Sequence, residues 1–268
     1  MRPFEPADFW NRAILILSVI AGSVGALLTV ALDRELFLAV QAGATTFLSW
    51  ALVRELDPDR QVSAMASAVV GGASALVGLP TAILPFAALL VTSRLIVETT
   101  GRRPLPTDLA ALAILATVIS YTPLGWVMGF GLAIAIFIDD RMAVEHSRHA
   151  LLAALAAAVG SSVVVTLVGA LPESLPTIRP LLVSGMGLLA LLAAIREPVE
   201  PVSFVDSRNK RFLRRDRLQA GRVAVGVIIF VGALVSGNGA GAVVPMALAL
   251  AIALASTEVE RVQRPPPS

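Results

Sequence analysis

Two clusters of carboxylates, each placed where an apolar run ends, are the residues of this sequence best suited to chemistry. Acidic oxygens gathered in one place are the ligands that Mg²⁺ prefers, and Mg²⁺ in turn holds phosphate or diphosphate. If the clusters meet in the fold, they predict a Mg²⁺ site; the other interpretation is that they are solvated helix ends, neutralised by neighbouring arginines. The candidate metal ligands are Glu55, Asp57, Asp59, Asp139 and Asp140.

Candidate substrate-binding residues fall into two classes. Hydroxyl and amide side chains inside apolar runs can line a route for a neutral or amphipathic solute, or they can bond to their own helix. Arginines beside the acidic clusters and in a basic segment can hold a phosphate. The first class comprises Gln41, Thr45 and Ser161, and the second comprises Arg54, Arg141, Arg211 and Arg214.

A short stretch of the first acidic cluster resembles a known motif. The segment 54–58 resembles the end of the first Asp-rich motif of the UbiA family of membrane prenyltransferases, with Asp57 matching its last aspartate. The two earlier aspartate positions of that motif are occupied here by Val53 and Trp50. The segment 103–106 also resembles a stretch of that family, although it lies a whole helical hairpin later. The resemblance implies that Asp57 contacts Mg²⁺–diphosphate, and it does not assign the chain to the family.

Composition indicates that these residues belong to a membrane protein. Hydrophobic residues make up 56% of the 268-residue chain, charged residues make up 15%, and the mean hydropathy is +0.82. A soluble domain carries about 25% charged residues. The chain has no cysteine, which excludes disulfides, thiolate metal sites and cysteine nucleophiles. Its net charge of +2 does not indicate a surface that binds nucleic acid, so we expect no such partner.

The apolar runs predict an all-α fold of about ten transmembrane helices, arranged as five hairpins. We expect one membrane domain over residues 13–256, preceded by a short segment 1–12 and followed by a disordered tail 257–268. Glycines such as Gly25 and Gly129 should let helices approach closely. The expected spans are Ala13–Leu32, Leu36–Val53, Ser63–Leu79, Thr81–Val97, Leu109–Tyr121, Leu124–Ile138, Ala150–Leu171, Leu181–Ile195, Val223–Val235 and Ala240–Ala255.

The basic residues predict the orientation of these spans. With a cytoplasmic amino terminus, 19 of the 21 arginines and lysines fall on the cytoplasmic side, and only Arg34 and Arg179 fall outside. The positive-inside rule therefore predicts that both termini are cytoplasmic and that the chain is a multi-pass protein of the inner membrane. Within the basic loop 196–222, we expect the segment 208–217 to bind anionic lipid headgroups.

Acids also recur along the chain at the ends of the apolar runs. Glu55, Glu98, Asp140, Glu197 and Glu258 follow one another at intervals of 43, 42, 57 and 61 residues. Such a loose period indicates a repeated helical pair.

These features favour three functions. The leading hypothesis is a membrane protein that binds or translocates a small neutral or lipid-like solute. The alternative is a membrane-embedded transferase or phosphatase that acts with Mg²⁺ on a lipid phosphate or prenyl diphosphate at the cytoplasmic face. The third is a structural subunit of a membrane complex.

Overall fold

The computed structural model describes residues 8–32, 35–79, 81–99, 103–122, 124–168, 185, 188, 191–192, 195, 204–206, 211–212, 214–235 and 242–263. Apart from one short strand pair, every regular element in these residues is a helix, which confirms the predicted helical fold class. The elements are α1 (Phe9–Leu32), α2 (Phe37–Leu56), α3 (Gln61–Leu76), α4 (Ile83–Val97), α5 (Pro106–Ile119), α6 (Gly125–Arg141), α7 (Arg148–Val168), β1 (Phe204–Asp206), β2 (Arg211–Phe212), α9 (Arg215–Val235) and α10 (Val244–Gln263).

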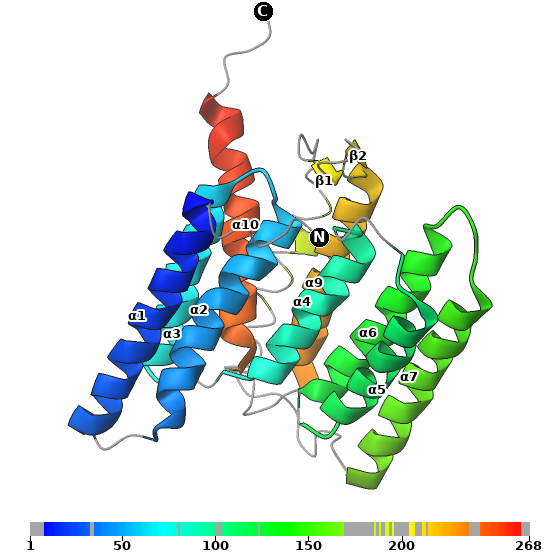
Figure 1. Ribbon diagram of the computed structural model, residues 1–268, viewed down its shortest axis with the longest axis horizontal. Helices are drawn as coiled ribbons and strands as arrows, with labels where there is room; N and C mark the ends of the chain where they lie inside the picture. Colours follow the sequence, from blue (N-terminus) through cyan, green and yellow to red (C-terminus); the bar gives the residue numbers. More distant parts are fainter. Residues whose placement is uncertain are drawn as a thin grey trace, which may run out of the picture.

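Helices α1 to α7 alternate in direction, as do α9 and α10, and the helices form two groups joined by a central pair (Figure 1). Helices α1, α2 and α3 pack together on one side, with α10 against α2 and α3, and helices α5, α6 and α7 pack together on the other. Helix α4 contacts α2, α6 and α9, so α4 and α9 connect the two groups. The ends of α2, α4 and α6 consequently lie at the same end of the molecule as the start of α9. We call this end, which comprises the residues around Leu56, Val97, Arg141 and Arg215, the charged rim.

Local sequence explains where several helices begin and end. Asp8 begins α1, because its Oδ1 accepts a hydrogen bond of 2.8 Å from the backbone N–H of Trp10. Pro106 occupies the first turn of α5, where a missing N–H costs nothing. Helix α4 ends at Glu98, whose backbone is left-handed with φ of 59° and whose N–H donates to the carbonyl of Arg94. Among the described residues, Glu98 is the one non-glycine residue with positive φ.

Small residues set the closest helix contacts, as the sequence predicts. A Cβ added at Gly25 would lie 2.9 Å from the Cα of Ala39 on α2, and one added at Gly129 on α6 would lie 2.5 Å from the Ser161 hydroxyl and 2.7 Å from the Ala116 carbonyl. Backbones therefore approach one another at these points more closely than any side chain allows.

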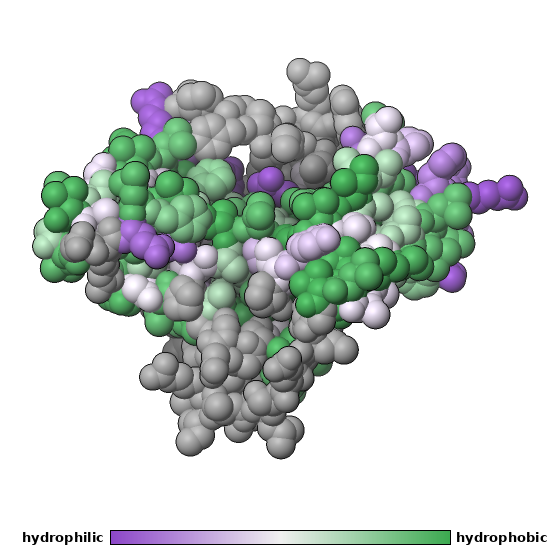
Figure 2. Space-filling view, turned by 90° about the horizontal axis from the view of Figure 1, so that it is seen from below, coloured by the Kyte–Doolittle hydropathy of each residue, from purple (hydrophilic) through white to green (hydrophobic). Residues whose placement is uncertain are grey.

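Three of the described helices, α1, α7 and α9, are long and apolar enough to cross a membrane. Large apolar side chains project from α1 and α7, among them Val30 at 85% exposure and Leu167 at 77%. Figure 2 shows apolar residues on both flanks of the face opposite the charged rim. These features support association with a membrane.

The structure does not confirm ten spans. Helices α3, α4 and α5 and the apolar part of α10 are shorter than a full span, because charged or turn-forming residues bound them closely. Most of the expected span Leu181–Ile195 lies outside the described residues.

Two expected loop regions contain regular structure. Part of the basic loop 196–222 is ordered, because β1 pairs antiparallel with β2, with Phe204 opposite Phe212, and α9 begins at Arg215. Helix α10 continues to Gln263, into the segment expected to be a disordered tail. No glycine or proline interrupts residues 246–264, so nothing local stops that helix at residue 256.

Candidate functional site

The centre of the charged rim is formed by two buried arginines near the start of α9. Arg217 is 3% exposed and Arg222 is 0% exposed. Taking a guanidinium out of water costs several kcal/mol unless other groups replace its hydration. Both side chains meet carbonyl and carboxylate oxygens at the ends of other helices.

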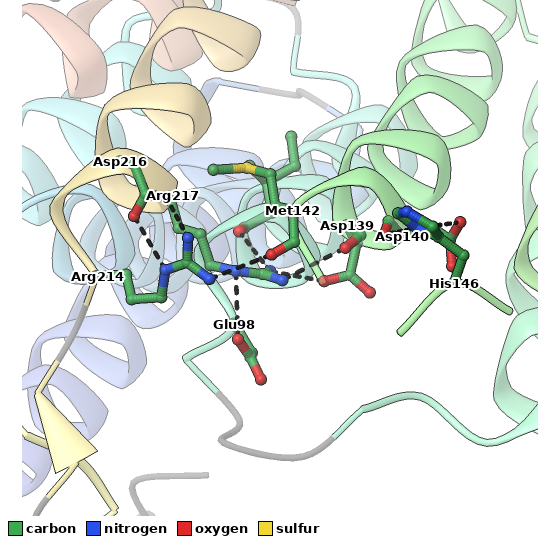
Figure 3. Close-up of polar contacts among 9 residues, drawn as sticks. Glu98, Asp139, Asp140, Met142, His146, Arg214, Asp216 and Arg217 are labelled. Atoms are coloured by element: carbon green, nitrogen blue, oxygen red, sulfur yellow. Dashed lines mark hydrogen bonds and ion pairs between the residues drawn. The ribbon is translucent and has the colours of Figure 1, made fainter. Parts of the chain in front are cut away.

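Arg217 joins the ends of α4 and α6 (Figure 3). Its Nη1 donates to Asp139 Oδ1 at 2.6 Å and to the carbonyl oxygen of Ile96 at 3.1 Å. Its Nη2 donates to the backbone carbonyl of Asp139 at 3.3 Å, and its Nε lies 3.3 Å from Glu98 Oε2. One guanidinium thus contacts two carboxylates and two backbone carbonyls at the ends of α4 and α6.

Arg222 makes the equivalent contact with the end of α2. Its Nε donates to the carbonyl of Leu56 at 2.7 Å, and its Nη2 lies 3.9 Å from Asp57 Oδ1. Asp57 is itself buried at 4% exposure, and Arg60 approaches its other oxygen at 3.5 Å. Helix α9 therefore holds the ends of α2, α4 and α6 together.

The acids at these three helix ends are regularly spaced. Asp57, Glu98 and Asp139 follow one another at intervals of 41 residues, which is a stricter period than the one formed by the more obvious charged residues nearby. Each acid adds to the partial negative charge of a helix carboxyl end. The 41-residue period marks the three helix carboxyl ends that each face an arginine of α9.

A pocket of about 410 Å³ opens next to Arg217. It lies between the end of α4, the connection from α6 to α7, and the start of α9. Its volume falls within the range of sites that hold small molecules. The lining residues are Glu98, Arg103, Met142, Ala143, Val144, Glu145, Arg214 and Arg217.

Hydrogen bonds fix two walls of this pocket. Arg214 binds the Asp216 carboxylate through two nitrogens and donates to the carbonyl of Met142 at 3.1 Å. The hydrogen bonds to Asp216 raise the pKa of Arg214 above its ordinary value, so the Arg214 guanidinium stays protonated and paired with that carboxylate. The connection after α6 is closed by Asp140, whose Oδ1 accepts a hydrogen bond of 2.6 Å from the backbone N–H of Ser147.

The five acids predicted to bind Mg²⁺ do not meet in the described residues. Glu55 pairs with Arg94 at 2.7 Å, while Asp57 and Asp139 face different arginines of α9. Asp140 binds the loop that follows it, and Asp59 is exposed in the turn after α2. No group of three or more acidic or histidine side chains in the described part of the chain is arranged to hold a metal ion. The Mg²⁺ site stays a prediction.

The polar residues predicted to line a route lie apart. Thr45 is buried on α2 and Gln41 is half-buried on the same helix, whereas Ser161 is buried on α7, in the other helical group. The Ser161 hydroxyl donates to the carbonyl of Ala116 at 3.3 Å, which is a contact between helices. Their role in lining a route for a solute stays a prediction.

The predicted arginines have separate surroundings. Arg54 donates to Asn11 Oδ1 at 2.6 Å and stacks on the Trp50 ring, and the exposed Arg141 lies over the ring of Phe137. Arg211 lies in β2, and its side chain falls outside the described residues.

Of the predicted arginines whose side chains the structure describes, only Arg214 lines the pocket. Arg217, which we expected on the membrane surface, is buried because the acids of α4 and α6 bind it. The sequence reasoning missed the importance of Arg222, Glu98 and Arg103; the strict spacing of the helix-end acids was the one signal that could have indicated Glu98.

Comparisons with protein-family models, with curated proteins and with solved structures found no match for this chain, so its function has to be argued from the geometry of the rim and its pocket.

Proposed function

We propose that this chain is a multi-pass protein of the inner membrane that binds, in the rim pocket, the polar end of a small or lipid-like solute. The observation that carries the proposal is the pocket itself, which adjoins the buried arginine Arg217 and is lined by Arg103, Arg214, Glu98 and Glu145. Charged groups of both signs in a concave site provide orientation and specificity for a polar headgroup.

The surroundings of the pocket suit a solute with an apolar part. Met142, Ala143 and Val144 form an apolar section of its lining, and Val144 is 94% exposed. Beyond the rim, α7 presents a row of exposed leucines and valines. A headgroup held at the rim would thus leave its chains beside apolar surface, where burial is favourable.

For the membrane arrangement we propose about ten spans in five hairpins, with the charged rim and both termini on the cytoplasmic side. Its support is the alternating helix direction and the concentration of arginines at one end. Helices shorter than a full span would then extend through their flanking polar residues or sit where the bilayer is thinned.

Native mass spectrometry tests the proposal. The full chain, purified in mild detergent, should carry a co-purified lipid-like adduct. Arg103→Gln should weaken its binding about tenfold, because a charge-assisted hydrogen bond is lost. Arg103 suits this test because no hydrogen bond or ion pair ties it to other described residues, so the substitution leaves the ion pairs of the rim intact.

Arg141→Gln is the matched control, since Arg141 is an exposed arginine of the same rim that does not line the pocket. The absence of any adduct, or an equal adduct on the wild type and the Arg103 variant, would refute the proposed function. The transferase or phosphatase alternative gains no specific observation from the described residues, and neither does the structural subunit.

A further inference from the structure

Two side chains of opposite charge line the pocket without a partner among the described residues. Arg103 makes no hydrogen bond or ion pair with any of them, and neither does Glu145. They do not pair with each other either, although they line the same pocket. Arg103 influences Asp139 electrostatically, but over more than ion-pair distance. Among the described residues, the pocket therefore offers one available cation, Arg103, and one available anion, Glu145.

The other charges of the pocket are already neutralised within the protein. Arg214 is bound by Asp216, and Arg217 is bound by Asp139 and Glu98. Within the described residues, the charged lining side chains, together with Asp139 and Asp216 that pair with them, comprise three guanidinium groups and four carboxylates. A ligand that is only anionic would face an excess of carboxylates, whereas one that is only cationic would face Arg103.

We infer that the rim pocket selects a zwitterionic ligand, in which an ammonium group stands close to a phosphate, with Arg103 binding the phosphate and Glu145 binding the ammonium. This inference rests on the proposed function and names the class of solute. Where its phosphate is a diester, such a ligand is electrically neutral, so it adds no net charge to a site whose own charges nearly balance. Each end of the ligand would gain a charge-assisted hydrogen bond that neither Arg103 nor Glu145 makes within the described protein.

The same pair of groups occurs in two kinds of molecule. An aminophospholipid carries it in the headgroup, and a soluble aminophosphate carries it free in solution. The apolar section at Val144 suits either, because it contacts the short carbon chain that separates the two charges.

Binding to delipidated full-length protein in detergent distinguishes these cases. Phosphatidylethanolamine, phosphatidylglycerol and phosphatidic acid with identical acyl chains are titrated and followed by native mass spectrometry. Soluble O-phosphoethanolamine and ethyl phosphate are titrated by calorimetry. The variants are Glu145→Gln, Arg103→Gln and, as a matched control, Glu35→Gln, because Glu35 is an exposed acid in the turn before α2, at the opposite end of the helices from the rim.

The expected result is a preference of about fivefold for the ligand that carries the ammonium, because an exposed charge pair is worth up to about 1 kcal/mol. Glu145→Gln should remove this preference, Glu35→Gln should preserve it, and Arg103→Gln should weaken every phosphate ligand. If phosphatidylethanolamine binds more tightly than the other two lipids, the ligand is an aminophospholipid. If O-phosphoethanolamine binds more tightly than ethyl phosphate, the ligand is a soluble aminophosphate.

Two other outcomes separate the inference from the proposed function. Equal binding of the three lipids, weakened by Arg103→Gln and unchanged by Glu145→Gln, would overturn the zwitterionic selectivity and leave the proposed function standing. If no lipid and no soluble phosphate binds, both fall together.

Discussion

Replacing Arg217 with methionine should destabilise the protein strongly. The substitution keeps an unbranched apolar stem but removes the group that binds Asp139 at 2.6 Å and Glu98 at 3.3 Å. The two carboxylate side chains, only 12% and 15% exposed, would then stay behind without their cation. Removing one partner of a buried ion pair costs about 3–5 kcal/mol, and the remaining solvent access of both acids favours the lower end, about 3 kcal/mol.

Thermal unfolding of the detergent-solubilised protein, followed by circular dichroism at one fixed scan rate, measures this loss. For a chain of this size, about 3 kcal/mol corresponds to a fall in Tm of about 6–10 °C. The matched control is Arg141→Met, which removes an exposed arginine stacked on Phe137 and should change Tm by less than about 2 °C.

The double variant Arg217→Met/Asp139→Leu tests the cause. If the loss comes from a stranded carboxylate, removing that carboxylate should restore part of the Tm, since a buried ion pair can often be replaced by apolar residues without penalty. A fall no larger than that of the Arg141 control, or a double variant that loses the sum of both single effects, would refute the reasoning.

Three further predictions follow from the fold. In this cysteine-free chain, single cysteines at Val144 and Glu35 should react with a membrane-impermeant maleimide from opposite sides of the membrane; labelling of both from one side would contradict the hairpin arrangement. Gly129→Ala should cost about 1–3 kcal/mol through overpacking, measured as a lower Tm, while Gly185→Ala, which meets no atom within 4 Å, should not lower it. The Tm of the Glu98→Gly variant should lie about 2–4 °C above that of the Glu98→Ala variant, because both lose the carboxylate but only glycine adopts φ of 59° without strain. Equal Tm values would argue against that strain.

The sequence predicted the helices well wherever apolar runs were bounded by turn-forming residues. The run Leu36–Val53 became α2, which continues through Arg54 and Glu55 to Leu56 because both are good helix formers and the next break is Pro58. The start of α9 was not predictable in the same way. Its first two turns contain several charged residues and resemble a solvated loop, and they are helical because their arginines bind acids on other helices.

The pairings of the rim were beyond the reach of a single sequence. Arg217 and Asp139 lie 78 residues apart, and Arg222 and Leu56 lie 166 apart, so no local pattern joins them. Charge alone suggested a different grouping, which stays a prediction. It placed acids with acids around a metal, whereas in the described fold the acids of the helix ends are each met by an arginine.

The choice of arginine at the rim follows from the hairpin architecture. When helices alternate in direction, every second carboxyl end lies on the same side, and each brings unpaired carbonyls with partial negative charge. The acids Asp57, Glu98 and Asp139 increase that charge. A lysine ammonium is a compact point charge, but a guanidinium carries five donors in a planar fork, so Arg217 can bind carbonyls and carboxylates of α4 and α6 together. Because the same guanidinium forms a wall of the pocket, the contacts that close the bundle also fix the geometry in which a ligand would meet Arg103 and Glu145.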